Sequence, residues 1–190
     1  MNYFILWAGA LYPGERTRRL EGDDWAGLEA GAFIDGVKIE RAITQPIDID
    51  LIEDDKGDAV LPPLFVVPAL VLRKDVAQAL QECGVDNIDY YPAVLHDRRR
   101  KKHWNDYMVG NVLGLMDVID MRRSVLDPGS PPEVAMIFET MVIDEKKCRG
   151  QKLFRLMHRQ NLVVISQEVA DHLRSKSFPF LHIVSPEDFA

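Results

Sequence analysis

Two apolar runs followed directly by a helical pattern lie near the C-terminal end of the chain, and this order restricts the fold more than any other feature. Residues 153–156 and 162–166 are rich in large and β-branched apolar side chains, which favour strands. Residues 167–174 have helical periodicity, and Ser166 stands where an N-cap is expected. The run therefore predicts two core strands and a capped helix, with one last strand after residues 178–180.

Strand patterns outnumber helical ones in the rest of the chain. The clearest helix covers residues 73–83, where Val76, Ala77 and Leu80 share one face and Gly84 is the expected stop. Strand patterns cover residues 2–8, 37–43, 87–95, 106–112, 115–121 and 134–143, with candidate bulges at Gly110 and Gly114. Strands and helices do not alternate regularly, and no internal repeat is visible. We therefore expect an α+β fold, with a largely antiparallel sheet and a few short helices.

The length of 190 residues is typical of one domain, so we expect residues 1–190 to form a single domain. Its apolar runs are shorter than the ~20 residues that a membrane helix needs, and no basic segment precedes the apolar residues 3–7. Cys83 and Cys148 are far apart and lack metal-ligand spacing. We interpret them as free thiols in a reducing compartment, and we expect a cytoplasmic protein that binds no membrane.

Residues 48–58 form an acidic stretch with six carboxylates in eleven residues. A calcium-binding loop needs an oxygen ligand at its fifth position, where this chain has Ile52. Three interpretations remain: a solvated loop, a face that docks on a basic partner, or a metal site. The candidate partner-binding residues are Asp48, Asp50, Glu53, Asp54, Asp55 and Asp58.

The charge is unevenly distributed between the two halves of the chain. Residues 1–95 carry 8 basic and 17 acidic side chains, whereas residues 96–190 carry 15 and 13, and the whole chain has a net charge of −7. An acidic surface repels nucleic acids and anionic membranes, and it attracts basic partners. This distribution favours a basic protein as the partner of the N-terminal half.

Residues 98–102 are five consecutive basic residues, with His96, His103, Trp104 and Tyr107 nearby. Basic side chains beside aromatic ones could hold phosphates and stack on bases. The run also stands between two predicted strands, where a hairpin tip would carry charge for solubility alone. We prefer the solvated loop, and we expect no nucleic acid partner.

The sequence shows no catalytic motif. Its five histidines lack metal-ligand spacing, and a nucleophile elbow, a phosphate-binding glycine loop and a zinc-protease helix are all missing. Asp117 and Asp120 lie among apolar residues, and Arg155 is a candidate ion-pair partner for one of them because a buried charge must be paired. We expect a protein that is not an enzyme and has no cofactor, no catalytic residue and no metal ligand.

Three stretches together resemble a family of bacterial proteins. They are GVDNIDYYP at residues 84–92 after the helix, YMVGNVL at 107–113 followed by Val118–Asp120 and Ser124, and LFRL at 153–156 followed by VVIS at 163–166 and its helix. In order and spacing, residues 70–180 resemble the polymorphic-toxin immunity family numbered eleven, long catalogued as a domain of unknown function. Residues 1–69 match little of it, so the family-like core is residues 70–190. The basic run at Arg98 and the Lys176-Ser177 pair before Phe178 depart from the family pattern.

The resemblance implies an intracellular protein that binds a cognate bacterial toxin domain and blocks it. We expect the partner to be a toxin protein, such as a nuclease, whose active site is occluded. The alternative is a metal-dependent hydrolase that uses residues 48–58. A third hypothesis is a nucleic-acid-binding module that acts through residues 98–102.

Overall fold

The computed structural model of the chain describes residues 2–11, 13–22, 24–25, 27–54, 57–133 and 135–189. Short helices and many strands occur in these ranges, and most strand pairs are antiparallel, so the predicted α+β class is confirmed. The helices are α1 (Lys74–Glu82), α2 (Gln167–Lys176) and the 3₁₀ turns η1 (Ala30–Phe33) and η2 (Pro186–Asp188). The strands are β1 (Tyr3–Ala8), β2 (Asp24–Trp25), β3 (Leu28–Glu29), β4 (Ile47–Asp50), β5 (Leu64–Phe65), β6 (Leu70–Arg73), β7 (Ile88–Asp97), β8 (Lys102–Val112), β9 (Leu115–Met116), β10 (Val125–Leu126), β11 (Phe138–Thr140), β12 (Leu153–Leu156), β13 (Arg159–Ser166) and β14 (Leu181–Val184).

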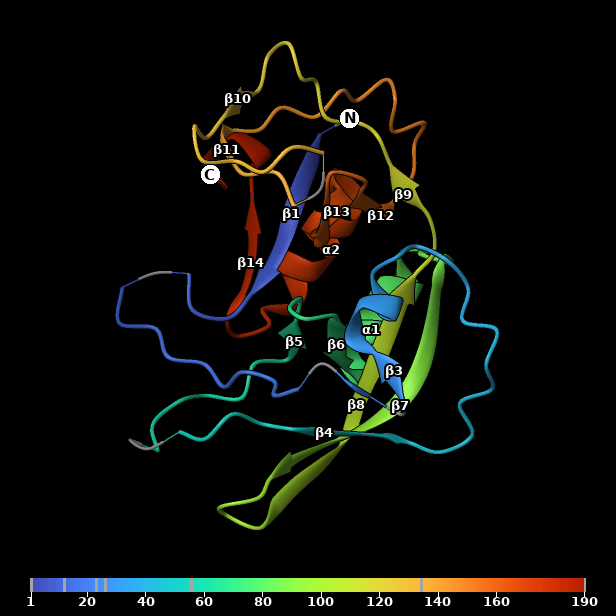
Figure 1. Cartoon of the computed structure of the whole chain (residues 1–190), viewed down its shortest axis with the longest axis vertical. Helices are drawn as coiled ribbons and strands as arrows, with labels where there is room; N and C mark the ends of the chain where they lie inside the picture. Colours follow the sequence, from blue (N-terminus) through green and yellow to red (C-terminus); the bar gives the residue numbers. More distant parts are fainter. Residues whose placement is uncertain are drawn as a thin grey trace.

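Two five-stranded sheets form the body of the molecule (Figure 1). The upper sheet has the order β14-β1-β13-β12-β9, and the lower sheet has the order β4-β7-β8-β6-β5. Only β9–β12 and β4–β7 are parallel among the pairs of these two sheets in the described part of the chain. The long β7–β8 hairpin extends beyond the rest of the lower sheet (Figure 1).

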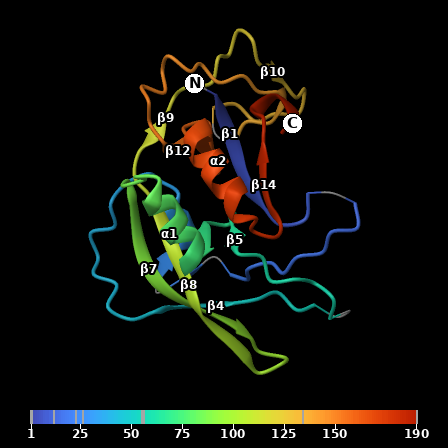
Figure 2. The ribbon, with the colours of Figure 1, turned by 180° about the vertical axis from the view of Figure 1, so that it is seen from behind.

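One core joins both sheets and both helices. Its members include Leu6 from β1, Leu70 and Leu72 from β6, and Val163 and Ile165 from β13, together with the apolar faces of α1 and α2. Figure 2 shows the two helices side by side, and they contact each other. Residues 1–69 and 70–190 thus both contribute side chains to this core.

The outer face of each sheet is covered by a long irregular segment. Val71 faces away from α1 and packs with Trp25 and Phe33 from the N-terminal segment. Val164 faces away from α2 and packs with Phe138 and other residues of the segment that follows β9. Because the side chains of a strand alternate between its faces, β6 and β13 each contribute to two cores.

The chain contains a short repeat that becomes visible once the two strand–helix units are compared. Residues 71–80 span the end of β6 and most of α1, and residues 164–173 span the end of β13 and most of α2. Aligned without a gap, they share valine at the first and sixth positions, alanine at the seventh and leucine at the tenth. Each helix follows its strand without a loop. The molecule is therefore built around two similar strand–helix units whose helices meet in the middle.

The strong apolar patterns predicted the elements that carry the core. The predicted strands at residues 2–8, 87–95 and 106–112 correspond to β1, β7 and β8, and the predicted helix at 73–83 corresponds to α1. The C-terminal run forms β12, β13, α2 and β14 in the predicted order. The basic run at residues 98–102 lies at the tip of the β7–β8 hairpin.

Three predicted strands are wrong or too long. Residues 37–43 form no strand, because Asn111 Nδ2 donates to the Val37 carbonyl at 2.8 Å and the neighbouring Gly36 carbonyl accepts from Gly114 N at 2.7 Å. Residues 115–121 are a strand only at Leu115–Met116. In 134–143 only Phe138–Thr140 is a strand, and Val134 lies outside the described residues.

The two predicted bulges, at Gly110 and Gly114, also differ from the structure. Gly110 is in register within β8, and the irregularity of that hairpin lies between Ala93 and Leu95 on β7, so the predicted bulge at Gly110 is wrong. Gly114 lies between β8 and β9 with a φ of 91°. A Cβ at Gly110 would lie 3.0 Å from Leu70 Cδ2, so close packing explains this glycine.

Ser166 and Arg155 differ from their predicted roles as well. Ser166 occupies the N-cap of α2, but its hydroxyl makes no capping hydrogen bond. Arg155 is fully buried and donates from Nη1 to the Gln160 carbonyl at 2.8 Å, not to Asp117 or Asp120. Burial lowers the pKa of Arg155 to about 10.

Candidate functional site

The acidic stretch at residues 48–58 lies directly against the basic run at residues 98–102, although the two are far apart in the sequence. Strand β4 runs parallel to β7 and places Asp50 opposite His96. His96 Nε2 lies 2.6 Å from Asp48 Oδ1, and Arg98 Nε donates to Asp50 Oδ1 at 2.7 Å. The two charged features therefore form one surface, in which carboxylates and cations neutralise each other in part.

Behind this surface lies a buried ion pair. Arg18 Nη1 donates to Asp97 Oδ2 at 2.7 Å, and both side chains are nearly inaccessible. Arg100 Nη1 reaches the same oxygen at 2.8 Å, and Arg18 Nη2 donates to the Ile52 carbonyl at 3.0 Å. Burial alone would raise the pKa of Asp97, but the hydrogen bonds from Arg18 and Arg100 hold it well below its ordinary value. The pair fixes the hairpin tip to the N-terminal segment.

Asp54 stabilises the loop that carries the acidic stretch. Its side chain is only 4% exposed, and it accepts hydrogen bonds from Ala59 N at 3.0 Å and Arg16 Nη2 at 3.2 Å. These bonds, the one from Ala59 above all, lower the pKa of Asp54. Arg16 also forms an ion pair with Asp58. The predicted residue Asp55 lies outside the described residues.

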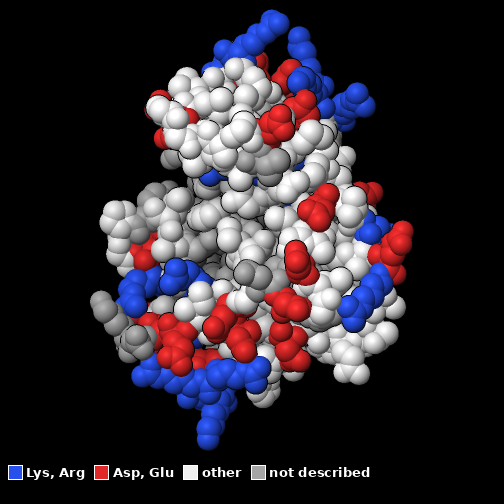
Figure 3. Space-filling model, viewed as in Figure 1, with Lys and Arg blue, Asp and Glu red and all other residues white. Residues whose placement is uncertain are grey.

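The acidic stretch thus separates into an exposed group and an inner residue. The side chains of Asp48, Glu53 and Asp58 are 69%, 70% and 61% exposed, and that of Asp50 is 35% exposed. Glu53 lies 3.7 Å from Arg99, which is also exposed. Acidic and basic side chains lie next to each other at the lower end of the face in Figure 3. The four outer carboxylates are accessible to a partner, whereas Asp54 positions the loop.

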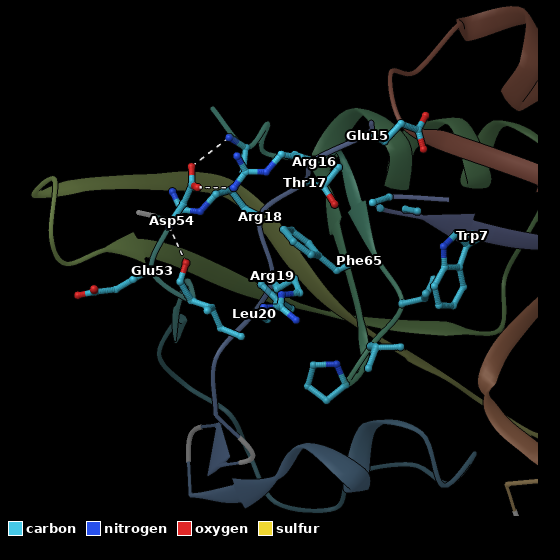
Figure 4. Close-up of a pocket in the computed structure, with 18 residues that line it drawn as sticks. Trp7, Glu15, Arg16, Thr17, Arg18, Arg19, Leu20, Glu53, Asp54 and Phe65 are labelled. Atoms are coloured by element: carbon cyan, nitrogen blue, oxygen red, sulfur yellow. Dashed lines mark hydrogen bonds and ion pairs between the residues drawn. The ribbon is translucent and has the colours of Figure 1, made fainter. Parts of the chain in front are cut away.

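A cavity of about 730 Å³ lies next to the inner ion pairs. Figure 4 shows Trp7 at one end, the charged group of Arg16, Arg18 and Asp54 at the other, and Phe65 between them. The lining comes from residues 7–10, 15–20, 52–54, 59 and 65–68. These segments are far apart in sequence and carry no common motif, so the sequence offered no signal for the cavity.

The remaining candidate groups take part in local ion pairs. Asp117 lies 3.4 Å from His158 Nε2, and Asp120 accepts from Arg123 Nε at 2.7 Å. Across the ranges that the structure describes, no cluster of three or more His, Cys, Asp or Glu residues could hold a metal ion. Both cysteines are buried free thiols, and burial raises the pKa of Cys148 to about 11.

Comparison with known proteins gives no match: neither a protein-family model nor a curated protein corresponds to this chain. In the described part of the chain, neither helix combines the length and the apolar character that a membrane crossing requires.

Proposed function

We propose that this chain is a cytoplasmic immunity protein that binds a cognate bacterial toxin domain and occludes its active site. The observation that carries the proposal is the acidic rim formed by Asp48, Asp50, Glu53 and Asp58, which is exposed and held in place by ion pairs behind it. The resemblance of residues 70–180 to the immunity family adds to it.

The rim is suited to rapid association with a basic protein. Carboxylates on a fixed backbone lose little conformational freedom on binding, and their charge steers a partner of opposite sign. A nuclease toxin presents a basic groove that binds phosphates, and the rim carboxylates would occupy the positions of those phosphates. A stable complex of this kind buries on the order of 1,600 Å².

The pairing of opposite charges also favours a protein over a nucleic acid as the partner. Arg98 and Arg100, the basic residues that would bind phosphates, already donate to Asp50 and Asp97. A polyanion would have to approach the rim carboxylates as well, which repel it. A protein surface can present both signs of charge and match this arrangement.

A metal-dependent hydrolase that uses the acidic stretch is the rival proposal. Asp48 faces His96, and Asp50 and Asp54 face arginine side chains, rather than one another, which is why we prefer the immunity function. Metal analysis of the purified protein separates the two proposals. A stoichiometric divalent ion that is lost when Asp48 and Asp50 are changed to Asn would reverse this preference.

The immunity function is tested by co-expression with the toxin-like product of the adjacent gene. We expect cells to survive and the two proteins to co-purify. The triple variant Asp48→Lys/Glu53→Lys/Asp58→Lys should lose protection. Its matched control, Glu40→Lys/Glu139→Lys/Glu187→Lys, changes three carboxylates on exposed residues elsewhere and should keep it. Death of the cells that carry the unaltered protein would contradict the proposal.

A further inference from the structure

Strand β14 forms one edge of the upper sheet, and β1 is its only strand neighbour in the described part of the chain (Figure 1 and Figure 2). The β4 edge of the lower sheet differs, because Leu20 pairs there with Leu51 and Glu21 N donates to the Asp50 carbonyl at 2.7 Å. An open sheet edge presents unpaired backbone groups to which another strand can bond. The β14 edge is therefore a candidate interaction surface.

The hydrogen-bond ladder between β14 and β1 identifies the backbone groups that face outward. Gly9 N donates to the Phe180 carbonyl at 3.3 Å, so these two residues form a bonded pair. Bonded and non-bonded pairs alternate along an antiparallel ladder, so every second residue after Phe180 also bonds to β1. The N–H and C=O groups of Leu181 and Ile183 therefore point away from β1, and no described residue bonds to them there.

A groove of about 310 Å³ lies between β14 and the C-terminal end of α2. Leu173 and Phe178, from α2 and the turn after it, line the groove together with Leu181 and Ile183. Phe178, Leu181 and Ile183 are only half-buried, so apolar surface adjoins the open edge. Directly opposite residues of an antiparallel pair have their side chains on the same face. The residues of an added antiparallel strand that bond to Leu181 and Ile183 would therefore also fill the groove.

The charge of the groove indicates what such a strand should carry. Among the described residues, Arg174 is the only Lys, Arg, Asp or Glu in the lining. Its Nη1 donates to Asp171 at 3.2 Å, and its other nitrogens make no hydrogen bond with any described residue. A carboxylate on a bound segment would complement this cation, whereas a second copy of the chain would bring a second Arg174 to the same edge.

We propose that the β14 edge binds an extended segment of a partner chain as an antiparallel strand, with apolar side chains at alternate positions in the groove and a carboxylate near Arg174. The open backbone groups, the groove beside them and the cation in its lining carry this proposal. It does not depend on the immunity function, because neither β14 nor α2 belongs to the acidic rim.

The order of residues in a test peptide follows from the position of Arg174. Its guanidinium lies 4.8 Å from the centre of the Phe4 ring, beyond Ile5, which pairs with Val184 at the end of β14. An antiparallel segment begins at that end of β14, so its acidic residue should come first. The probe is acetyl-Thr-Glu-Thr-Val-Thr-Val-Thr-amide, titrated into the whole ¹⁵N-labelled protein.

We expect the peptide to shift the amide signals of Leu181 and Ile183 saturably and to slow hydrogen exchange at both amides, because their N–H groups become bonded. N-methylation of both valines of the peptide removes the donors that face β14 and should weaken binding at least about tenfold. N-methylation of the third and fifth residues, whose N–H groups face away from β14, is the matched control and should leave the affinity nearly unchanged. The proposal is overturned if the peptide shifts neither amide, or if the two methylated peptides bind equally well.

Arg174→Gln should weaken binding of the peptide by about threefold, the effect of one exposed ion pair. Arg122→Gln, at an exposed arginine that does not line the groove, should leave the affinity unchanged. A second copy is the competing occupant of the edge. Slow exchange at Leu181 and Ile183 without peptide, in a protein that sediments as a dimer, would assign the edge to that copy and overturn the proposal.

Discussion

Arg18 and Arg155 are both buried, but only Arg18 has a carboxylate partner. Arg18 bonds to Asp97, whereas Arg155 Nε and Nη2 have no hydrogen-bond partner and Nη1 has only the Gln160 carbonyl. Breaking a buried ion pair leaves a charge without compensation, while replacing an unpaired buried charge by an apolar side chain removes a desolvation cost. The two arginines should therefore respond oppositely to the same substitution.

We predict that Arg18→Met lowers the free energy of unfolding by about 3 kcal/mol, and that Arg155→Met changes it by less than about 1 kcal/mol or raises it. Urea unfolding of both variants measures the difference. An equal loss of unfolding free energy in the two variants would show that the ion pair with Asp97 does not set Arg18 apart from Arg155.

Asp97 makes the stability of the protein depend on pH. Its pKa in the folded state lies below the ordinary value of 3.8, so folding favours the ionised carboxyl. This contribution is fully present above about pH 4 and is lost as the pH falls further toward the folded-state pKa. Asp97→Asn should lower the free energy of unfolding by about 3 kcal/mol at pH 7, and the difference from the unaltered protein should shrink below pH 4. A difference that stays constant from pH 7 to pH 2.5, measured by urea unfolding, would refute this assignment.

At the scale of single elements, apolar patterns predicted the strands and helices that form the core. Residues 2–8, 73–83 and 153–166 carry strong apolar patterns because each buries one face, or both faces, in a core. The same reasoning failed for residues 37–43. Ile39 and Ile43 do pack against a core, but the backbone there hydrogen-bonds to a side chain and a turn rather than to a strand.

The sequence predicted parts of the candidate site but not how they come together. The acidic stretch and the basic run are each visible as composition, but their pairing depends on the register of β4 with β7, more than forty residues away. Asp54 is buried and Asp58 is exposed although both pair with Arg16, and neither contact is visible in the sequence because Arg16 is about forty residues away. The cavity is lined by five stretches that are separate in the sequence, so no local pattern could predict it.

The N-terminus of α2 provides a prediction at this scale. The Ser166 hydroxyl is buried and makes no hydrogen bond, whereas the Ser124 hydroxyl accepts from Val142 N at 2.9 Å. We expect Ser166→Ala to change the free energy of unfolding by less than about 0.5 kcal/mol and Ser124→Ala to lower it by about 1 kcal/mol. Thermal unfolding of the two variants checks this. A loss of about 1 kcal/mol in Ser166→Ala would show that the hydroxyl caps the helix after all.

At the scale of the whole molecule, two similar strand–helix units meet at a common core, and the irregular segments cover the outer faces of the sheets. The N-terminal part supplies β1 between β14 and β13 in one sheet and β4 to the edge of the other. That edge carries the acidic rim. Residues 70–190 therefore provide most of the scaffold, and residues 1–69 provide the strand and the loop that carry the proposed contact surface.

The most direct test of the proposed function is the rate of association with the proposed toxin partner, measured as a function of salt. We predict that Asp48→Asn/Glu53→Gln/Asp58→Asn slows association about tenfold at 20 mM salt and far less at 500 mM, because exposed charges are screened at high salt. The control Glu40→Gln/Glu139→Gln/Glu187→Gln has the same change in net charge and should slow it much less. Equal rates for the two triple variants at low salt would contradict the acidic rim as the docking surface.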